Sequence, residues 1–277
     1  MAAQLKVALT HDVDRTTKSH QYITHLLRAL KKGDLPAARY HATTWNKRKD
    51  VYWNFEDILD IENKYGVKST FFFLIESFPF LFLRPSTWKL SLGRYDIQDE
   101  RIQQMIQYLD RNGWEIGLHG SYASYNNLEL LKEEKHKLES ITGHPVKGIR
   151  QHYLNLNHQT WGLQQQAGFQ YDSSWGFTRD IGFKDDKIKP FHPLNDHFMV
   201  FPLAIMDSCY MNTPNRVRKL QDIIQKCLDH DAVLVINWHS NNFHEKEFTG
   251  WKDAYREVIE VCMDYNTRFQ TLQIFIP

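Results

Sequence analysis

The sequence has few cysteines, and the three present form no recognisable pattern. Cys209, Cys227 and Cys262 are odd in number and widely spaced. This spacing predicts neither a disulfide framework nor a zinc ribbon. Because disulfides persist mainly in oxidising compartments, such cysteine usage favours a reducing, cytoplasmic setting.

Long apolar runs and an excess of one charge are also missing. No run approaches the roughly 18–20 apolar residues that cross a bilayer, so no transmembrane segment is expected. Gln4 and Lys6 interrupt the apolar stretch at the N-terminus, which argues against an export signal. The 34 Lys and Arg residues balance 33 Asp and Glu residues, for a net charge of +1. We therefore expect no nucleic acid partner, because such partners need a basic surface.

The 277 residues instead show strands alternating with helices, which predicts one α/β domain over residues 1–277 with a parallel sheet or barrel. We expect strands at residues 6–10, 69–74, 115–118, 148–150, 199–201, 232–238 and 271–276, and the beginning of another at residues 171–172. Apolar residues at helical spacing lie at residues 54–64, 99–112, 127–141, 159–166, 216–229 and 251–265.

Two stretches depart from this alternation. Residues 15–53 are longer than an ordinary connection between a strand and a helix, and we expect this insertion to shape a cleft at the carboxyl ends of the strands. Residues 173–209 show no clear helix, and we expect them to be mostly loops.

Residues able to bind metal or move protons follow several of the predicted strands. Asp12 and Asp14 follow the first strand, His119 follows the strand at 115–118, and His239 follows the strand at 232–238. Another strand ends on Arg150 and leads into His152. Because parallel strands end on one face of the sheet, we expect these side chains to converge there.

Asp12 and Asp14 are two residues apart, so an extended segment puts both carboxylates on one side. Two close carboxylates repel each other unless a cation or a shared proton intervenes. A divalent metal with an imidazole ligand would resolve the repulsion and leave one carboxylate as a base. Alternatively, either Asp could cap the turn that follows, and a single histidine at a strand end is more often structural. The joint occurrence at successive strand ends favours the metal site.

The order of these residues resembles that of the polysaccharide deacetylase family, metal-dependent carbohydrate esterases with a distorted (β/α)₇ barrel. The family's first motif resembles residues 10–14, Thr-His-Asp-Val-Asp. The other motifs resemble residues 117–121 (Gly-Leu-His-Gly-Ser), 150–153 (Arg-Gln-His-Tyr), 171–175 (Tyr-Asp-Ser-Ser-Trp) and 234–239 (Leu-Val-Ile-Asn-Trp-His). The resemblance spans residues 6–240, in order, with motifs that are each short and permissive.

The resemblance implies a role for each matching residue. Asp12 would be the general base, Arg150 the partner that keeps Asp12 ionised, and His239 the general acid. Asp14 and His119 would bind a divalent metal, with zinc expected and cobalt, nickel or manganese as alternatives. In this reaction a water activated by the metal attacks an acetamide carbonyl.

The chain departs from the family pattern in two places. The second metal histidine of the family would fall on Ala123, and the proline of the third motif is replaced by His152. We expect His152 to serve as the third metal ligand. His11 is a second possibility, although packing or support of a ligand suits it better.

We also expect residues that contact the substrate. Backbone N–H groups near Tyr153 would stabilise the oxyanion, and the indoles of Trp175 and Trp238 would pack on a sugar ring. An ordinary core role is the competing interpretation for any tryptophan.

The resemblance implies a hydrolase that removes an N-acetyl or other N-acyl group from an amino sugar. The expected location makes the substrate a cytoplasmic glycan or glycan precursor, as in capsule or lipopolysaccharide synthesis. A non-catalytic carbohydrate-binding or assembly protein on the same barrel is the alternative from another class. A hydrolase of cyclic or other linear amides is a third possibility.

Overall fold

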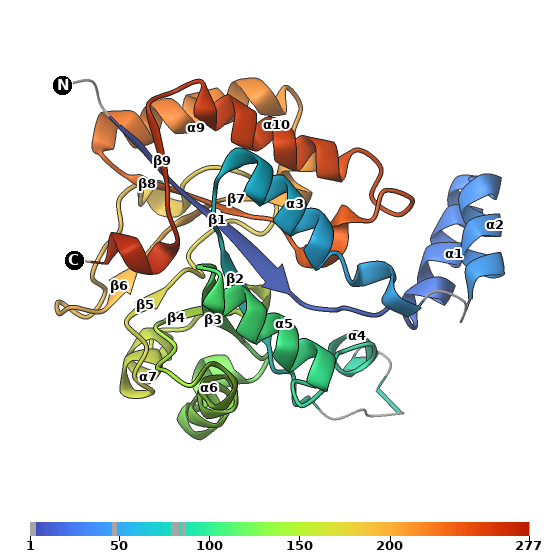
Figure 1. The fold of residues 1–277 in the computed structure, drawn as a ribbon, viewed down its shortest axis with the longest axis horizontal. Coiled ribbons are helices and arrows are strands. Elements are labelled where there is room, and N and C mark those ends of the chain that lie inside the picture. The colour runs from blue at the N-terminus through green and yellow to red at the C-terminus, as the bar shows by residue number, and fades with distance from the viewer. Residues whose placement is uncertain (1–3, 46–48, 79–82, 85–86, 277) are drawn as a thin grey trace.

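The computed structural model describes residues 4–45, 49–78, 83–84 and 87–276. Strands and helices alternate along the chain (Figure 1). The strands are β1 (Leu5–Val13), β2 (Thr70–Leu74), β3 (Glu115–Gly120), β4 (Gly148–Gln151), β5 (Tyr171–Asp172), β6 (Met199–Val200), β7 (Leu203–Met206), β8 (Val233–Asn237) and β9 (Thr267–Phe269). The helices are α1 (Gln21–Lys32), α2 (Leu35–Thr44), α3 (Phe55–Tyr65), α4 (Trp88–Ser91), α5 (Glu100–Arg111), α6 (Leu128–Thr142), α7 (Thr160–Gln166), α8 (Asp207–Met211), α9 (Arg216–His230) and α10 (Trp251–Met263).

The strands form one curled parallel sheet in the order β6-β5-β4-β3-β2-β1-β8-β7, with β9 beside the start of β1. A parallel bridge between Gly176 and Leu203 links the segment after β5 to β7 and so joins the two ends of the sheet. The backbones approach so closely there that a Cβ on Gly176 would lie 2.7 Å from the carbonyl oxygen of Leu203. The predicted α/β fold with a distorted barrel is confirmed.

The long helices lie around the outside of the curled sheet, with α3, α9 and α10 on one side and α5, α6 and α7 on the other (Figure 1). Most of them bury an apolar stripe: α5, for example, buries Ile102, Ile106 and Leu109. The residues that α7 buries are instead Thr160 and Gln164. Side chains also fix the helix starts, because Asp99 and Asn127 accept hydrogen bonds from backbone N–H groups in the first turns of α5 and α6.

Side chains alternate between the two faces of each strand. Val7 and Leu9 of β1 face the helices, whereas Ala8 faces the barrel interior with Phe72, Tyr171 and other apolar residues. A 3-10 helix, Leu272–Phe275, closes the amino-terminal end of the barrel, where the N–H of Leu272 donates to Thr70. The strand predicted at residues 271–276 is therefore wrong: Leu272 inserts into the interior instead of extending the sheet.

The two stretches that depart from the alternation contain more regular structure than predicted. The insertion at residues 15–53 forms helices α1 and α2, which stand away from the barrel (Figure 1). Strand β7 and the first residues of helix α8 lie within the region predicted to be mostly loops. No helix in the described ranges combines the length and the apolar character needed to cross a membrane. The three cysteines are buried and carry free thiols.

Candidate metal centre and active site

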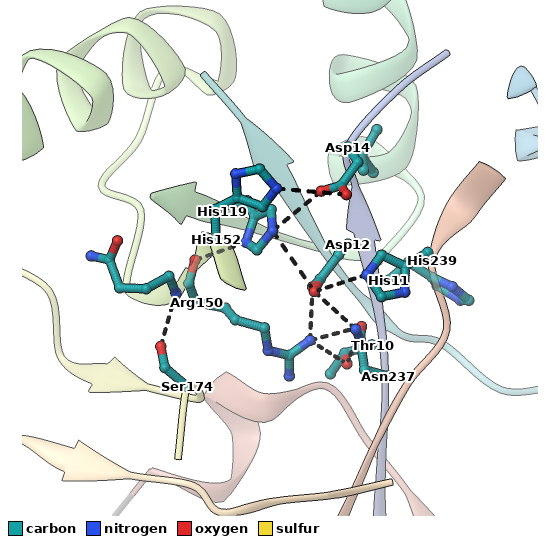
Figure 2. Close-up of polar contacts among 12 residues, drawn as sticks. Thr10, His11, Asp12, Asp14, His119, Arg150, His152, Ser174, Asn237 and His239 are labelled. Carbon is teal, nitrogen blue, oxygen red and sulfur yellow. Dashed lines mark hydrogen bonds and ion pairs between the residues drawn. The ribbon is translucent and has the colours of Figure 1, made fainter. Parts of the chain in front are cut away.

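The alternation of side chains selects which residues enter the barrel at its carboxyl end. Asp12 shares the inward face of β1 with Ala8, and Asn237 shares the inward face of β8 with Val235. His119 on β3 and Arg150 on β4 alternate with Leu118 and Ile149, which face the helices. Figure 2 shows these inward side chains converging from four different strands.

Asp12 lies at the centre of a buried polar network. Nη1 of Arg150 donates to its Oδ1 atom over 2.9 Å, and the amide of Asn237 donates to its Oδ2 atom over 2.8 Å. Arg150 is fully buried and also donates to the hydroxyl of Thr10 and the carbonyl of Ser173. Burial alone would raise the pKa of Asp12, but the Arg150 charge and the nearby histidines outweigh burial and lower the pKa. Asp12 is therefore ionised near neutral pH.

Asp14, His119 and His152 bring one donor atom each within 4.8 Å of one another. Nε2 of His119 is 3.3 Å from Oδ1 of Asp14, and Nε2 of His152 is 3.8 Å from Oδ2 of Asp14. The two imidazoles lie next to each other, with ring centroids 5.2 Å apart, and both face the carboxylate of Asp14 (Figure 2). The structure thus brings together the three residues that the sequence predicts as metal ligands.

The remaining nitrogen of each imidazole faces a protein oxygen. Nδ1 of His119 is 2.8 Å from the carbonyl oxygen of Arg150, so Nδ1 carries the proton and Nε2 keeps its lone pair. Nδ1 of His152 is 3.5 Å from Oε2 of Glu76, a buried carboxylate that follows β2. Such outer contacts orient imidazole ligands in metal sites. Ala123, where the family motif would have its second histidine, precedes the 3-10 turn Ser124–Asn126.

His11 lies on the opposite face of β1 from Asp12. Its Nδ1 contacts the carbonyl of Trp238 over 2.8 Å, and its Nε2 contacts Glu62 over 2.9 Å. The imidazole also packs against Phe71 and Tyr255. His11 is therefore a packing residue, and its second-choice role as a metal ligand is wrong.

His239 lies two residues after the end of β8, and the carboxylate of Asp207 holds it in place. Asp207 accepts a 2.7 Å hydrogen bond from the backbone N–H of His239 and lies 3.0 Å from its Nδ1 atom. Burial would lower the pKa of His239, but the Asp207 carboxylate outweighs burial and raises the pKa to about 10. Nε2 of the protonated ring lies 4.0 Å from Oδ2 of Asp12, so an acid and a base face the same space.

These groups line a cavity of about 260 Å³. The residues that line it are Asp12, Asp14, Arg15, Arg94, His119, Gln151, His152, Tyr153, Leu154, Thr178, Met206, Ser208 and His239. Tyr153 and Leu154 both adopt positive φ, at 60° and 54°. Non-glycine residues pay a steric cost for this conformation, and such strain gathers at functional sites.

Tyr153 lines the cavity, but neither of the tryptophans predicted to contact the substrate does. Trp238 is fully buried and packs against Tyr210, Trp251 and Tyr255, which contradicts a substrate contact. Since Asn237 points inward, the next residue points outward to the helices. Trp175 is half-buried against Trp161 and is not among the residues that line the cavity.

Sequence patterns missed several residues of the site. Asp207 follows β7 directly, and Glu76 lies two residues after the end of β2, so the strand-end argument that identified Asp12 could have found Glu76. Asp207 was not among the predicted site residues because the strand β7, which it follows, was not predicted. Nothing in the sequence pointed to Arg94, which reaches the cavity from the segment after α4.

No protein-family model matches the sequence, and no curated protein matches it either. Solved structures do match. A candidate polysaccharide deacetylase from Mycobacterium smegmatis has 18% identity and a TM-score of 0.61, with 100% of this chain and 90% of that chain covered.

Two further solved structures have a TM-score of 0.50. One is a peptidoglycan N-acetylglucosamine deacetylase with 16% identity, with 99% of this chain and 88% of that chain covered. The other derives from a pseudoenzyme of carbohydrate esterase family 4 from Bacillus anthracis and is a mutant with restored enzymatic activity. Its identity is 11%, with 99% of this chain and 68% of that chain covered. At these identities the likeness shows that the chain has the fold of this family.

Proposed function

Starting from this shared fold, we propose that the chain is a divergent polysaccharide deacetylase, a metal-dependent hydrolase that removes an N-acyl group from an amino sugar. One observation carries the proposal. The donor atoms of Asp14, His119 and His152 share a cavity with Asp12, held by Arg150, and with His239, held by Asp207.

The three donors fit a divalent cation. Two ligand atoms about 2.1 Å from a tetrahedral ion lie about 3.4 Å apart, close to the 3.3 Å between His119 and Asp14. The lone pair of His119 Nε2 faces Asp14 because Nδ1 donates to a backbone carbonyl. Two imidazoles and one carboxylate suit zinc, and cobalt, nickel and manganese also accept such ligands.

A divalent cation bound by these residues would polarise the acyl carbonyl and acidify the attacking water. The chain's own residues account for the proton transfers. Asp12, kept ionised by Arg150, accepts a proton from the water. His239, kept protonated by Asp207, gives a proton to the departing amine.

The position of Tyr153 supports a contact with substrate. Its side chain is 45% exposed and lines the cavity beside His152, with ring centroids 4.4 Å apart. We assign it to substrate binding. A cytoplasmic location and a role in capsule or lipopolysaccharide synthesis stay predictions.

One observation favours the second candidate, a carbohydrate-binding protein without activity. The position of the family's second motif histidine is occupied by Ala123, so activity depends on His152 as its replacement. One solved structure with this fold derives from a pseudoenzyme.

Metal analysis and acetate release test the proposal together. We expect the purified chain to contain about one divalent metal per molecule and to release acetate from N-acetylglucosamine oligomers. Asp12→Asn should lower the rate by about 10²–10⁴-fold, the usual contribution of a general base. The control Asp222→Asn, at a partly exposed site on α9, should have no effect.

A chain that holds no metal and releases no acetate would contradict the deacetylase. If such a chain still bound the oligomers, the carbohydrate-binding protein would be the correct interpretation.

A further inference from the structure

Helices α1 and α2 form a hairpin, residues 21–44, that carries an exposed apolar stripe. Ile23, Leu27 and Leu30 of α1 stand at positions i, i+4 and i+7, so they share one face of the helix. Their side chains are 46%, 60% and 52% exposed, respectively. Leu35, at the start of α2, is exposed as well. Single exposed apolar residues are ordinary, but a row of them on one helix face indicates an interaction surface.

The barrel does not cover this stripe, because the hairpin stands away from it (Figure 1). The hairpin is held only near its base, where Lys18 pairs with Glu247 of the segment after β8. Nζ of Lys18 lies 2.9 Å from Nδ1 of His41, and the hydroxyl of Tyr52 donates to Glu247 over 3.1 Å. Because Lys18 neutralises Glu247, this pair adds no net charge to the hairpin.

The hairpin is basic, although the whole chain is nearly neutral. Residues 21–44 contain four basic residues and one acidic residue, for a net charge of +3 (4 − 1), so the rest of the chain carries −2 (1 − 3). Arg28, Lys31, Lys32 and Arg39 are all exposed. Within the residues that the structure describes, none of these four forms an ion pair. The carboxylate of Asp34 caps the start of α2.

The positive charges adjoin the apolar stripe. Arg28 and Lys31 each come one residue after a leucine of the stripe, a rotation of about 100° around the helix. A helix of this kind binds an anionic bilayer surface, since its apolar side chains enter the headgroup region and its basic side chains contact lipid phosphates. A second copy of the hairpin would instead bring like charges together, which disfavours self-association through this face.

We propose that the α1–α2 hairpin binds the surface of an anionic membrane, with Ile23, Leu27 and Leu30 inserted among the lipid headgroups. The attachment is peripheral, because the 12 residues of α1 extend only about 18 Å, less than the roughly 30 Å of a hydrocarbon core. The insertion begins directly after Asp14, so the membrane lies at the end of the barrel that holds the cavity. The inference goes beyond the proposed function and does not depend on it.

Sedimentation of the purified full-length chain with lipid vesicles tests the proposal. One set of vesicles is an equal mixture of phosphatidylglycerol and phosphatidylcholine, and the other is phosphatidylcholine alone. We expect the chain to bind the mixed vesicles at least about tenfold more tightly, since each basic residue near an anionic surface contributes about fivefold. Added salt should weaken this binding because it screens the charges.

Two variants separate the apolar and the electrostatic contributions. Leu27→Gln removes an inserted side chain and should weaken binding to the mixed vesicles by about tenfold. Lys31→Gln combined with Lys32→Gln should weaken it by about 25-fold, at about fivefold for each charge.

Each variant has a matched control outside the hairpin. Ile274→Gln changes a half-exposed apolar residue at the amino-terminal end of the barrel. Lys226→Gln changes an exposed basic residue on α9. Both controls should bind the mixed vesicles like the wild type, and melting curves verify that every variant is folded.

Three results would overturn the proposal: no binding to the mixed vesicles, equal binding to the two kinds of vesicle, or full binding by both hairpin variants. A dimer in light scattering that Leu27→Gln dissociates would also overturn it and assign the stripe to a second copy of the chain. Metal content and acetate release from soluble oligomers should not change in the hairpin variants, so these measurements test the proposed function separately.

Discussion

Asp207 is a single residue on which the protonation of His239 depends. Its carboxylate contacts both the backbone N–H and the Nδ1 atom of His239. The folded pKa of His239 is raised to about 10, so the acid form persists through neutral pH and is lost as the pH rises through this value. The Asp207 carboxylate is the main favourable cause of this shift.

Asp207→Asn should therefore lower the pKa of His239 and move the alkaline limb of the activity profile to lower pH. We expect deacetylation at pH 8 to fall by about 10²-fold, since a general acid contributes about 10²–10⁴-fold. The measurement is kcat against pH for the wild type, for Asp207→Asn and for the control Asp222→Asn. An unmoved alkaline limb would contradict the role of this pair.

Glu134 is a buried acid on α6 that affects stability. Its Oε2 accepts a 3.2 Å hydrogen bond from the N–H of Ser121. Burial raises its pKa to about 8, well above the ordinary value of 4.5. A group whose pKa is raised in the folded state contributes stability below its unfolded pKa, and this contribution is lost as the pH rises from about 4.5 through about 8.

Glu134→Gln keeps the shape but cannot ionise. We expect the free energy of unfolding of the wild type to decrease from pH 6 to pH 9 by at least about 1 kcal/mol more than that of the variant. Urea unfolding at both pH values measures the difference. Glu133→Gln, on the exposed face of the same helix, should behave like the wild type. Equal pH dependence of wild type and Glu134→Gln would refute the prediction.

At the scale of elements, the closure of the barrel depends on the contact of Gly176 with β7. A Cβ at Gly176 would meet the backbone oxygen of Leu203 at 2.7 Å and its Cβ at 2.9 Å. Gly176→Ala should reduce the free energy of unfolding by about 1–3 kcal/mol, the usual cost of overpacking. Gly162→Ala is the matched control, since nothing lies within 4 Å of a Cβ there in α7, and it should be neutral or stabilising. Similar urea midpoints for the two variants would argue against this closure.

At the scale of the whole molecule, metal binding should couple the strands that meet in the cavity. The proposed ligands come from β3 and from segments directly after β1 and β4, so the bound ion stabilises their assembly. At a free metal concentration 100 times Kd, the gain is about 2.7 kcal/mol. For a chain of this size we expect Tm to rise by about 5 °C or more on adding zinc to chelator-treated protein.

His152→Ala should abolish most of this rise, whereas His136→Ala, at an exposed position on α6, should preserve it. Differential scanning calorimetry with and without zinc makes the comparison. Equal metal retention by His152→Ala and the wild type would show that His152 is not the third ligand.

The sequence determined most of the barrel and the strand ends that carry Asp12, Asp14, His119, Arg150 and His239. Both follow from local patterns, because apolar periodicity specifies a strand or a helix wherever its partner lies. The same reasoning failed for residues 271–276, whose apolar character reflects the insertion of Leu272 into the barrel and not strand pairing.

Only the tertiary structure decided which partners surround those strand ends. Asp207 reaches His239, Glu76 reaches His152, and Arg94 reaches Asp14 across 32, 76 and 80 positions of sequence, respectively. Hydrogen bonds and ion pairs act over a few ångströms, and the folding of the sheet alone brings such distant residues that close. The sequence thus specified the reactive groups, and the closed barrel specified their protonation and the charge of the cavity they share.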